Sequence, residues 1–447
     1  MNKPIQSEDI HRFSERFAVD PKNRLAMNAV TKNDIATVAL SREAVTRVRH
    51  IYSHVIETPE ATDQKSSGRC WLFAGLNTLR LTVMRKLNLE QFELSQTYLM
   101  FWDKFEKINF FLEAIIQTRD EPRDGRLVMC LLADPIPDGG QWDMFVNLVR
   151  KYGVVPKAVV PETYSSSSSK TMNALLAAKM REGAQVLREL HAQGASLEAL
   201  SKAKDELLAD CYTMLCIHLG QPPESFVWEW RDKEKKFHRH GTITPQEFME
   251  QYVDCALDDY VCLINAPTAD KPYDRLYTVS YLGNVVEGQP VHYINAEIEV
   301  LKQASAAMIA DGKPVWFGCD VSKLLERQTG ALDLEIYDYE LLYGLPFKQD
   351  KAGRLDYGDS QMGHAMVLTG VNLDDEGKPL QWRVENSWGG TIGEKGYLVM
   401  SDPWFEEFLY EVVVDKSYLS AELAAVLDTD PLVLPPWDPM GSLAKAY

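Results

Sequence analysis

The spacing of apolar residues becomes helical directly after a small turn near residue 68. The turn is Ser66-Ser67-Gly68, and the apolar run that follows extends from Trp71 to Leu79. This pattern predicts a helix whose N-terminus lies at or near Cys70. Residues 1 to about 60 are predicted to be a helical lead-in, with one helix starting near Ser41.

The composition changes between about residues 165 and 300. Five serines, Ser165 to Ser169, precede two amphipathic stretches around Leu175–Leu190 and Leu197–Leu219. A third helix is predicted from Thr244, where Thr-Pro-Gln-Glu forms a capping box with proline in the first turn. These patterns predict a mostly helical insertion.

From about residue 300 the pattern favours strands. Two segments, His364–Val371 and Gln381–Asn386, flank a turn with the sequence Asp-Asp-Glu-Gly-Lys-Pro at 374–379. They predict a hairpin, and turn formation explains the paired aspartates better than catalysis does. Residues 431–441 hold too many prolines for a helix or a central strand, so we expect an extended arm there.

The net charge argues against some partners. The 447 residues include 47 basic and 65 acidic side chains, a formal charge of −18, which disfavours binding to nucleic acids and anionic membranes. We interpret the basic stretch from Lys233 to His240 as the solvated face of a helix. No apolar run approaches the roughly 18 residues that span a bilayer, and the first residues lack the apolar core of a secretory signal.

The cysteines indicate a reducing compartment. There are seven, without any Cys-x-x-Cys pair that would indicate a zinc ribbon or a thioredoxin-type site. We therefore expect a cytoplasmic protein in which most cysteines are small core residues. No motif indicates a cofactor or a metal: His-Glu-x-x-His is absent, and His238 with His240 has no evident acidic third ligand.

Four residues form a pattern typical of nucleophilic acyl transfer. A cysteine attacks as its thiolate, which a helix N-terminus and a nearby imidazolium favour; Cys70 has that helix position, and His364 starts a predicted strand. Asn386, on the next strand, can orient the histidine ring, and Trp388 can shield that hydrogen bond from water. Gln64 can donate to the oxyanion beside the Cys70 backbone N–H. A lone cysteine or histidine is more often structural, but the four in this order are far more specific.

The surrounding motifs resemble those of the papain-like cysteine peptidases, in particular the bleomycin hydrolase and aminopeptidase C branch. The resemblance is carried by Gln64, Gly68-Arg69-Cys70-Trp71, His364-Ala365, Glu385-Asn386-Ser387-Trp388-Gly389, Asp138–Met144 and Trp437–Gly441. It implies a papain-like, two-lobed α+β fold with Cys70 as nucleophile, His364 as acid and base, and Asn386 as its orienting partner. It also implies that Gln64 is the oxyanion donor and that Gly139 and Gly140 form the backbone strip along which a substrate lies.

The resemblance implies five segments. They are a lead-in packing on the β lobe (1–60), a helical lobe with the nucleophile (61–164), a mostly helical insertion for oligomerisation (165–300), a β lobe with the histidine and asparagine (301–430), and a C-terminal arm entering the active-site cleft (431–447). Cys70 and His364 are 294 residues apart, against roughly 130–150 in simple papain-like enzymes, and the insertion accounts for the excess. In the family such insertions build a hexameric ring, so a homohexamer is expected. Ser67 replaces the first cysteine of the usual signature, in agreement with a reducing compartment.

The resemblance also implies a broad-specificity cysteine aminopeptidase acting on peptides. In the family the arm blocks one side of the cleft, and its terminal carboxylate, here that of Tyr447, meets the α-amino group of the substrate. Residues 445–447 extend beyond where family arms commonly end, so we expect the enzyme to trim its own tail or the tail to shift specificity. Two alternatives remain: an endopeptidase on the same scaffold, if the tail leaves the cleft open, and a ring-forming scaffold or nucleic-acid-binding protein that merely retains the site.

Overall fold

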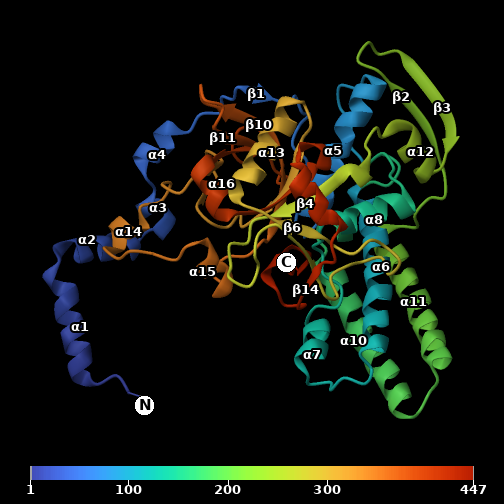
Figure 1. Cartoon of the computed structure of the whole chain (residues 1–447), viewed down its shortest axis with the longest axis horizontal. Coiled ribbons are helices and arrows are strands. Elements are labelled where there is room, and N and C mark those ends of the chain that lie inside the picture. The colour runs from blue at the N-terminus through green and yellow to red at the C-terminus, as the bar shows by residue number, and fades with distance from the viewer. Residues whose placement is uncertain (1–2, 446–447) are drawn as a thin grey trace.

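The computed structural model describes residues 3–445, in which a lobe of helices lies beside a lobe built on one large sheet (Figure 1). The helical lobe encloses an apolar core that includes Leu99, Phe145 and Leu176. Its helices are α5 (Cys70–Leu87), α6 (Gln96–Gln117), α7 (Arg126–Ala133), α8 (Trp142–Tyr152), α9 (Tyr164–Ser167), α10 (Lys170–Ala192), α11 (Leu197–Leu219) and α12 (Pro245–Tyr252). No helix between residues 3 and 445 has both the length and the apolar character of a membrane span.

A mixed sheet of twelve strands in the described part of the chain forms the second lobe. In spatial order, the strands are β14 (Leu432–Leu434), β5 (Arg275–Val279), β6 (Tyr293–Asn295), β4 (Tyr260–Ile264), β13 (Leu409–Asp415), β7 (Val315–Cys319), β10 (His364–Leu373), β11 (Pro379–Glu385), β12 (Tyr397–Ser401), β9 (Ala331–Leu332) and β8 (Leu325–Glu326), with β1 (His54–Val55) also paired to β10. The remaining helices of this lobe are α13 (Ile298–Ala310), α14 (Tyr339–Tyr343), α15 (Lys351–Asp356), α16 (Asp402–Phe408) and α17 (Ala421–Ala424).

The predicted hairpin is confirmed and forms the centre of the sheet. β10 and β11 pair antiparallel with Val367 opposite Glu385, so Asn386 directly follows the end of β11. On its other side β10 pairs with β7, and His364 lies opposite Cys319. All residues of β10 from 364 to 371 are buried, which explains their nearly continuous apolar sequence.

The predicted helix start at Cys70 is confirmed as well. α5 is apolar on almost all sides, as expected of a helix that other elements surround. It packs against β10 and β7 at the junction of the two lobes. It ends at Leu87, where Asn88 adopts a left-handed conformation with φ of 51°. The nucleophile candidate therefore lies at the start of a rigid element between the lobes.

The three helices predicted between residues 165 and 300 are present as α10, α11 and α12. The capping box at the start of α12 forms as expected: Thr244 Oγ1 accepts the Glu247 backbone N–H at 3.2 Å, and the Glu247 carboxylate accepts the Thr244 backbone N–H at 2.8 Å. The strands β4, β5 and β6 also fall within this range and join the main sheet. This segment therefore contains strands as well as the predicted helices.

The basic stretch from Lys233 to His240 does not form a helix face, so that prediction was wrong. It forms the turn and part of the second strand of a hairpin made by β2 (Phe226–Arg231) and β3 (Phe237–Ile243). Alternating burial along β2, with Trp228 buried and Val227 exposed, is the period of a strand. The available signal was the alternation of apolar and polar residues in Trp228-Glu229-Trp230-Arg231, just before the basic stretch.

Among the described residues, the N-terminal lead-in buries side chains only from its third helix onward, although its second helix already contacts α14. It contains α1 (Ser7–Val19), α2 (Pro21–Val30), α3 (Ile35–Ala39) and α4 (Arg42–Arg47). The first two helices bury no side chain, and α1 extends away from the rest of the chain (Figure 1). In α4, Ala44 packs against Ile336 and Val399, and β1 then pairs with β10.

Candidate active site

Cys70 is the first residue of α5, and its side chain is buried. The helix N-terminus places unsatisfied N–H groups and the positive end of the macrodipole at this residue. The preceding residue, Arg69, is held by Glu162 through two hydrogen bonds of 3.1 and 2.9 Å. This ion pair fixes the turn that leads into α5.

His364, the first residue of β10, is oriented by Asn386. Its Nε2 lies 2.9 Å from the Asn386 Oδ1, as the sequence predicts. The Trp388 ring packs against the histidine ring with centroids 4.9 Å apart and shields that hydrogen bond. Because Nε2 donates to the amide oxygen, Nδ1 is the nitrogen that can accept a proton from a thiol.

Burial has opposite effects on the two groups expected to react. It raises the pKa of the Cys70 thiol to about 11, against hydrogen bonds from backbone N–H groups that include Ala365, the neighbour of His364. It lowers the pKa of His364 to about 4, against the hydrogen bond to Asn386. Burial therefore opposes the charged form of each group, whereas the helix N-terminus at Cys70 favours the thiolate. Transfer of the thiol proton to the imidazole creates opposite charges whose attraction is strong in these water-poor surroundings.

Gln64 lies beside the turn that precedes Cys70, and both ends of its side-chain amide make hydrogen bonds. Nε2 donates to the Ser67 carbonyl at 2.5 Å, and Oε1 accepts from the Ser387 hydroxyl at 2.6 Å. The Gln64 backbone N–H also donates to the Ser387 carbonyl at 2.8 Å. Residue 387 follows Asn386, so Gln64 is connected to the segment that orients the histidine. One hydrogen of Nε2 remains available for a further acceptor.

Asp138 connects the glycine strip, Gly139-Gly140, to the turn that precedes Cys70. Its carboxylate accepts from the Gly68 backbone N–H at 3.1 Å and from Asn173 at 2.7 Å, and it pairs with Lys104 at 2.6 Å. Although burial opposes ionisation, the Lys104 ammonium and the hydrogen bonds, including one from Ser169, hold the pKa of Asp138 below its usual range. Asp138 therefore stays charged and bridges the strip, the nucleophile turn and α10.

Gly139 and Gly140 are both buried. A Cβ on Gly140 would lie 2.6 Å from the Trp71 ring, so close packing onto the nucleophile helix requires glycine there. The Gly139 carbonyl accepts from the Lys107 ammonium at 2.6 Å. The strip is thus fixed on its inner side by α5 and α6.

The C-terminal segment contacts both lobes next to these residues. It contains a short 3-10 helix, η4 (Pro439–Lys445), which buries four of its residues. The Met440 carbonyl accepts from the Gln141 amide at 3.3 Å, directly after the glycine strip. The Ser442 hydroxyl donates to the Met362 carbonyl at 2.8 Å, two residues before the histidine. The segment therefore bridges the junction of the lobes beside the candidate site.

The arm is anchored by a buried ion pair between Asp438 and Lys271, at 3.0 Å. Tyr447, whose carboxylate is predicted to meet the substrate amine, lies outside the described residues, as does Ala446.

The family model described as the Peptidase C1-like family matches residues 4–441. The chain belongs to this family. A bleomycin hydrolase of Mus musculus is 46% identical over 453 residues, covering 99% of this chain and 100% of that protein. An aminopeptidase C of Listeria monocytogenes is 45% identical over 444 residues, with the same coverage of the two chains. The crystal structure of PepW from Lactobacillus rhamnosis has a TM-score of 0.97, 48% identity and 99% coverage of both chains.

These similarities confirm two predictions made from the sequence. The predicted resemblance to the bleomycin hydrolase and aminopeptidase C branch extends over nearly the full chain. The predicted papain-like α+β fold agrees with membership of the Peptidase C1-like family and with the similarity to PepW. The catalytic roles of the individual residues stay predictions.

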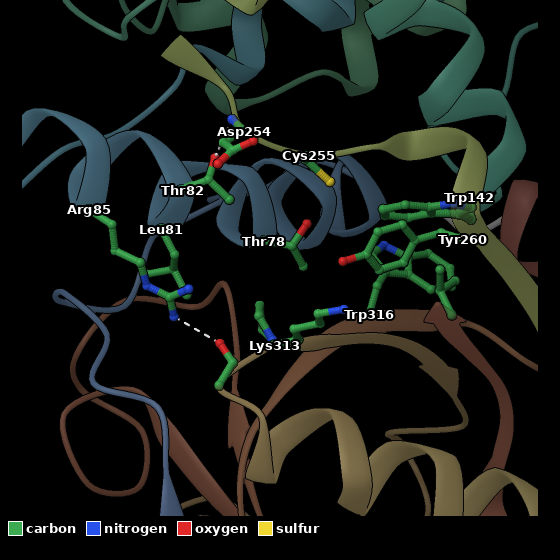
Figure 2. Close-up of a pocket in the computed structure, with 13 residues that line it drawn as sticks. Thr78, Leu81, Thr82, Arg85, Trp142, Asp254, Cys255, Tyr260, Lys313 and Trp316 are labelled. Atoms are coloured by element: carbon green, nitrogen blue, oxygen red, sulfur yellow. Dashed lines mark hydrogen bonds between the residues drawn. The ribbon is translucent and has the colours of Figure 1, made fainter. Parts of the chain in front are cut away.

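A separate cavity of about 160 Å³ lies toward the other end of α5 and does not contain Cys70. Figure 2 shows Thr78, Thr82 and Arg85 of α5 on one side and Cys255 with Tyr260 on another. Burial raises the pKa of the Cys255 thiol to about 11. No histidine lines this cavity, so no neighbouring imidazole can take the proton of that thiol.

Sequence reasoning missed the buried cations around the glycine strip. Lys104 and Lys107 are both buried, and Lys107 pairs with Asp103 at 2.7 Å within α6. The available signal was the high apolar content of the surrounding helix, which left little exposed face for these charges. Arg327, whose guanidinium carbon lies 4.9 Å from the centroid of the Trp388 ring, was also missed, and no motif surrounds it in the sequence.

Proposed function

We propose that this chain is a cysteine aminopeptidase that removes N-terminal residues from peptides with broad specificity. The observation that carries the proposal is the contact set at the start of α5. Cys70 begins α5 where this helix packs against β10, the strand that starts at His364, and Asn386 holds the His364 ring at 2.9 Å. The relatives named aminopeptidase C support removal of terminal residues.

In the proposed reaction Cys70 is the nucleophile. Its sulfur bonds to the substrate carbonyl carbon while His364 takes the thiol proton. The tetrahedral intermediate then collapses, the C–N bond breaks, and His364 gives that proton to the leaving amine. Water attacks the resulting thioester as His364 accepts a proton from it, the C–S bond breaks, and the proton returns to sulfur.

The developing oxyanion is bound by two donors in this proposal. They are the Cys70 backbone N–H at the helix N-terminus and the second hydrogen of the Gln64 Nε2. The hydrogen bond from Ser387 to the Gln64 Oε1 supports this role, because it fixes the amide with its nitrogen toward the nucleophile turn.

The C-terminal arm supports exopeptidase activity. With η4 hydrogen-bonded to Gln141 on one lobe and Met362 on the other, a long peptide has no path past this side of the site. A carboxylate at the end of the arm attracts the α-ammonium group of a short substrate. Gly139 and Gly140 then support the substrate backbone beside the nucleophile.

The experiment compares one fluorogenic aminoacyl amide with its α-amino group free or acetylated. We expect cleavage of the free amine and at least a 100-fold lower kcat/KM for the acetylated form. Comparable cleavage of both forms would contradict the aminopeptidase proposal and support an endopeptidase with an open cleft. A variant that ends at Met440 tests the arm directly, because its loss should raise cleavage of the acetylated substrate.

We also propose a cytoplasmic homohexamer that binds neither nucleic acids nor membranes. All seven cysteines are unpaired thiols, which supports a reducing compartment. The apolar side chains of Ile10, Phe13 and Phe17 on α1 are exposed in the single chain, which supports burial in an assembly. A solution mass of about six times 50.7 kDa by light scattering is expected, and a monomer mass would contradict the hexamer.

A further inference from the structure

One indole ring connects the active-site histidine to an exposed arginine. The Trp388 ring lies 4.9 Å from the His364 ring, and the Arg327 guanidinium carbon lies 4.9 Å from the same indole. Besides burial, which is the larger effect, the charge of Arg327 lowers the pKa of His364. The arginine therefore acts electrostatically on the reacting group although it lies on the surface.

Arg327 has no acidic partner among residues 3–445. The neighbouring Glu326 is used by its own turn, where its carboxylate accepts the backbone N–H groups of Gln328 at 2.9 Å and Thr329 at 2.7 Å. The Arg327 backbone is fixed, since its carbonyl accepts from the Gly393 N–H at 3.3 Å, while its side chain is exposed. In a chain with a net charge of −18, an unpaired cation beside the catalytic histidine needs an explanation.

The arginine lies on the leaving-group side of the site. His364 gives its proton to the leaving amine, so the peptide beyond the scissile bond must extend from this histidine. The described part of the arm hydrogen-bonds to Gln141 and Met362, and none of its hydrogen bonds goes to Trp388 or Arg327. The arm occupies one side, and the side of Trp388 receives the leaving group.

The distances fit a short leaving group. The His364 ring centroid and the Arg327 guanidinium carbon are at most twice 4.9 Å apart. After a hydrogen bond of about 2.9 Å at each end, at most about 4 Å remains, which fits one residue because a residue spans up to about 3.5 Å. A guanidinium stacked on an indole keeps its in-plane N–H groups free to bind a carboxylate in bidentate fashion.

We propose that Arg327 binds the C-terminal carboxylate of dipeptide substrates on the leaving-group side. The inference rests on the proposed aminopeptidase function and names the substrate class of that same site. The enzyme then recognises both ends of a short peptide, its α-amino group near the arm and its carboxylate at Arg327. An acidic side chain on the residue that follows the scissile bond offers the same chemistry.

The test measures kcat/KM for matched pairs of substrates that differ in one charge. The first pair is Ala-Ala and Ala-Ala amide, and the second is Ala-Asp amide and Ala-Asn amide. Wild-type enzyme should prefer the free acid of the first pair by about five- to tenfold, the size of one exposed charge-assisted contact. Arg327→Gln should remove this preference, mainly through KM, and Arg327→Lys should restore part of it because the charge returns without the planar fork.

Arg239→Gln is the matched control, because Arg239 is also exposed, lies on β3, and pairs with Glu229 at 2.6 Å. It makes the same change in net charge and should leave the preference as in wild type. The inference is overturned if Arg327→Gln keeps the wild-type ratio for the first pair, or if only the ratio of the second pair falls. Failure of wild-type enzyme to cleave any aminoacyl amide would instead refute the proposed function.

Discussion

Replacement of Asn386 by alanine tests how the histidine is controlled. Asn386→Ala removes the only side-chain hydrogen bond that His364 makes among the described residues, at 2.9 Å. The imidazole would keep its place at the start of β10 but lose the partner that fixes its tautomer and orientation. Because Asn386 orients and does not react, we expect turnover to fall without being abolished.

The magnitude follows from the change of charge on the ring during catalysis. A neutral hydrogen bond contributes about 0.5–1.5 kcal/mol, and one to a charged group about 1.5–3 kcal/mol. The bond to Asn386 is neutral in the resting site and charged when His364 carries the thiol proton. The difference of about 1–2 kcal/mol is lost only in the transition state, which lowers kcat about 5- to 30-fold.

The assay is steady-state cleavage of an aminoacyl amide across a range of pH. The hydrogen bond to Asn386 raises the pKa of His364, so its loss should also move the acid limb of the pH profile to lower pH. Asn147→Ala is the control, since this buried amide bonds only the backbone of Gln289 and should leave kcat unchanged. An unchanged kcat in Asn386→Ala, or a loss as complete as in His364→Ala, would refute the orienting role.

Three further outcomes are expected. Gly140→Ala should raise KM for peptides, because its Cβ would lie 2.6 Å from the Trp71 ring and displace the strip; unchanged peptide kinetics would contradict this. Asp138→Asn should lower the free energy of unfolding by about 3–5 kcal/mol, because Lys104 loses its buried partner. Denaturant titration measures this free energy, and a change below about 1 kcal/mol would contradict the prediction. Burial lowers the pKa of His364 to about 4. The pH profile of kcat/KM should therefore stay level down to about pH 5 and fall below about pH 4, because a protonated imidazole cannot take the thiol proton. An acid limb near the ordinary histidine pKa would contradict this prediction.

Local patterns were sufficient to predict the elements that carry the candidate site. The helix start at Cys70 follows from a small turn and an apolar run, and the hairpin that carries His364 and Asn386 follows from two short segments around one turn. The spacing of these residues along neighbouring strands is a property of the hairpin itself. The fold class came from the resemblance, because local patterns do not specify which elements pair.

The contacts between distant segments could not be predicted in the same way. Asp138 and Lys104 are separated by 34 positions in the sequence, and the sequence contains no sign that their side chains meet. The stacking of Arg327 on Trp388 depends on the arrangement of β8, β9 and β12 within the sheet. The effect of burial on the pKa of the Cys70 thiol also could not be predicted, because only the folded chain determines burial.

The central claim is that Cys70 is the nucleophile, and one comparison tests it most directly. Turnover of an aminoacyl amide is measured for wild type, Cys70→Ala and Cys255→Ala. Cys255 is the matched thiol, since burial raises the pKa of both to about 11. We predict no turnover above background in Cys70→Ala and wild-type turnover in Cys255→Ala. Wild-type turnover in Cys70→Ala would contradict the account.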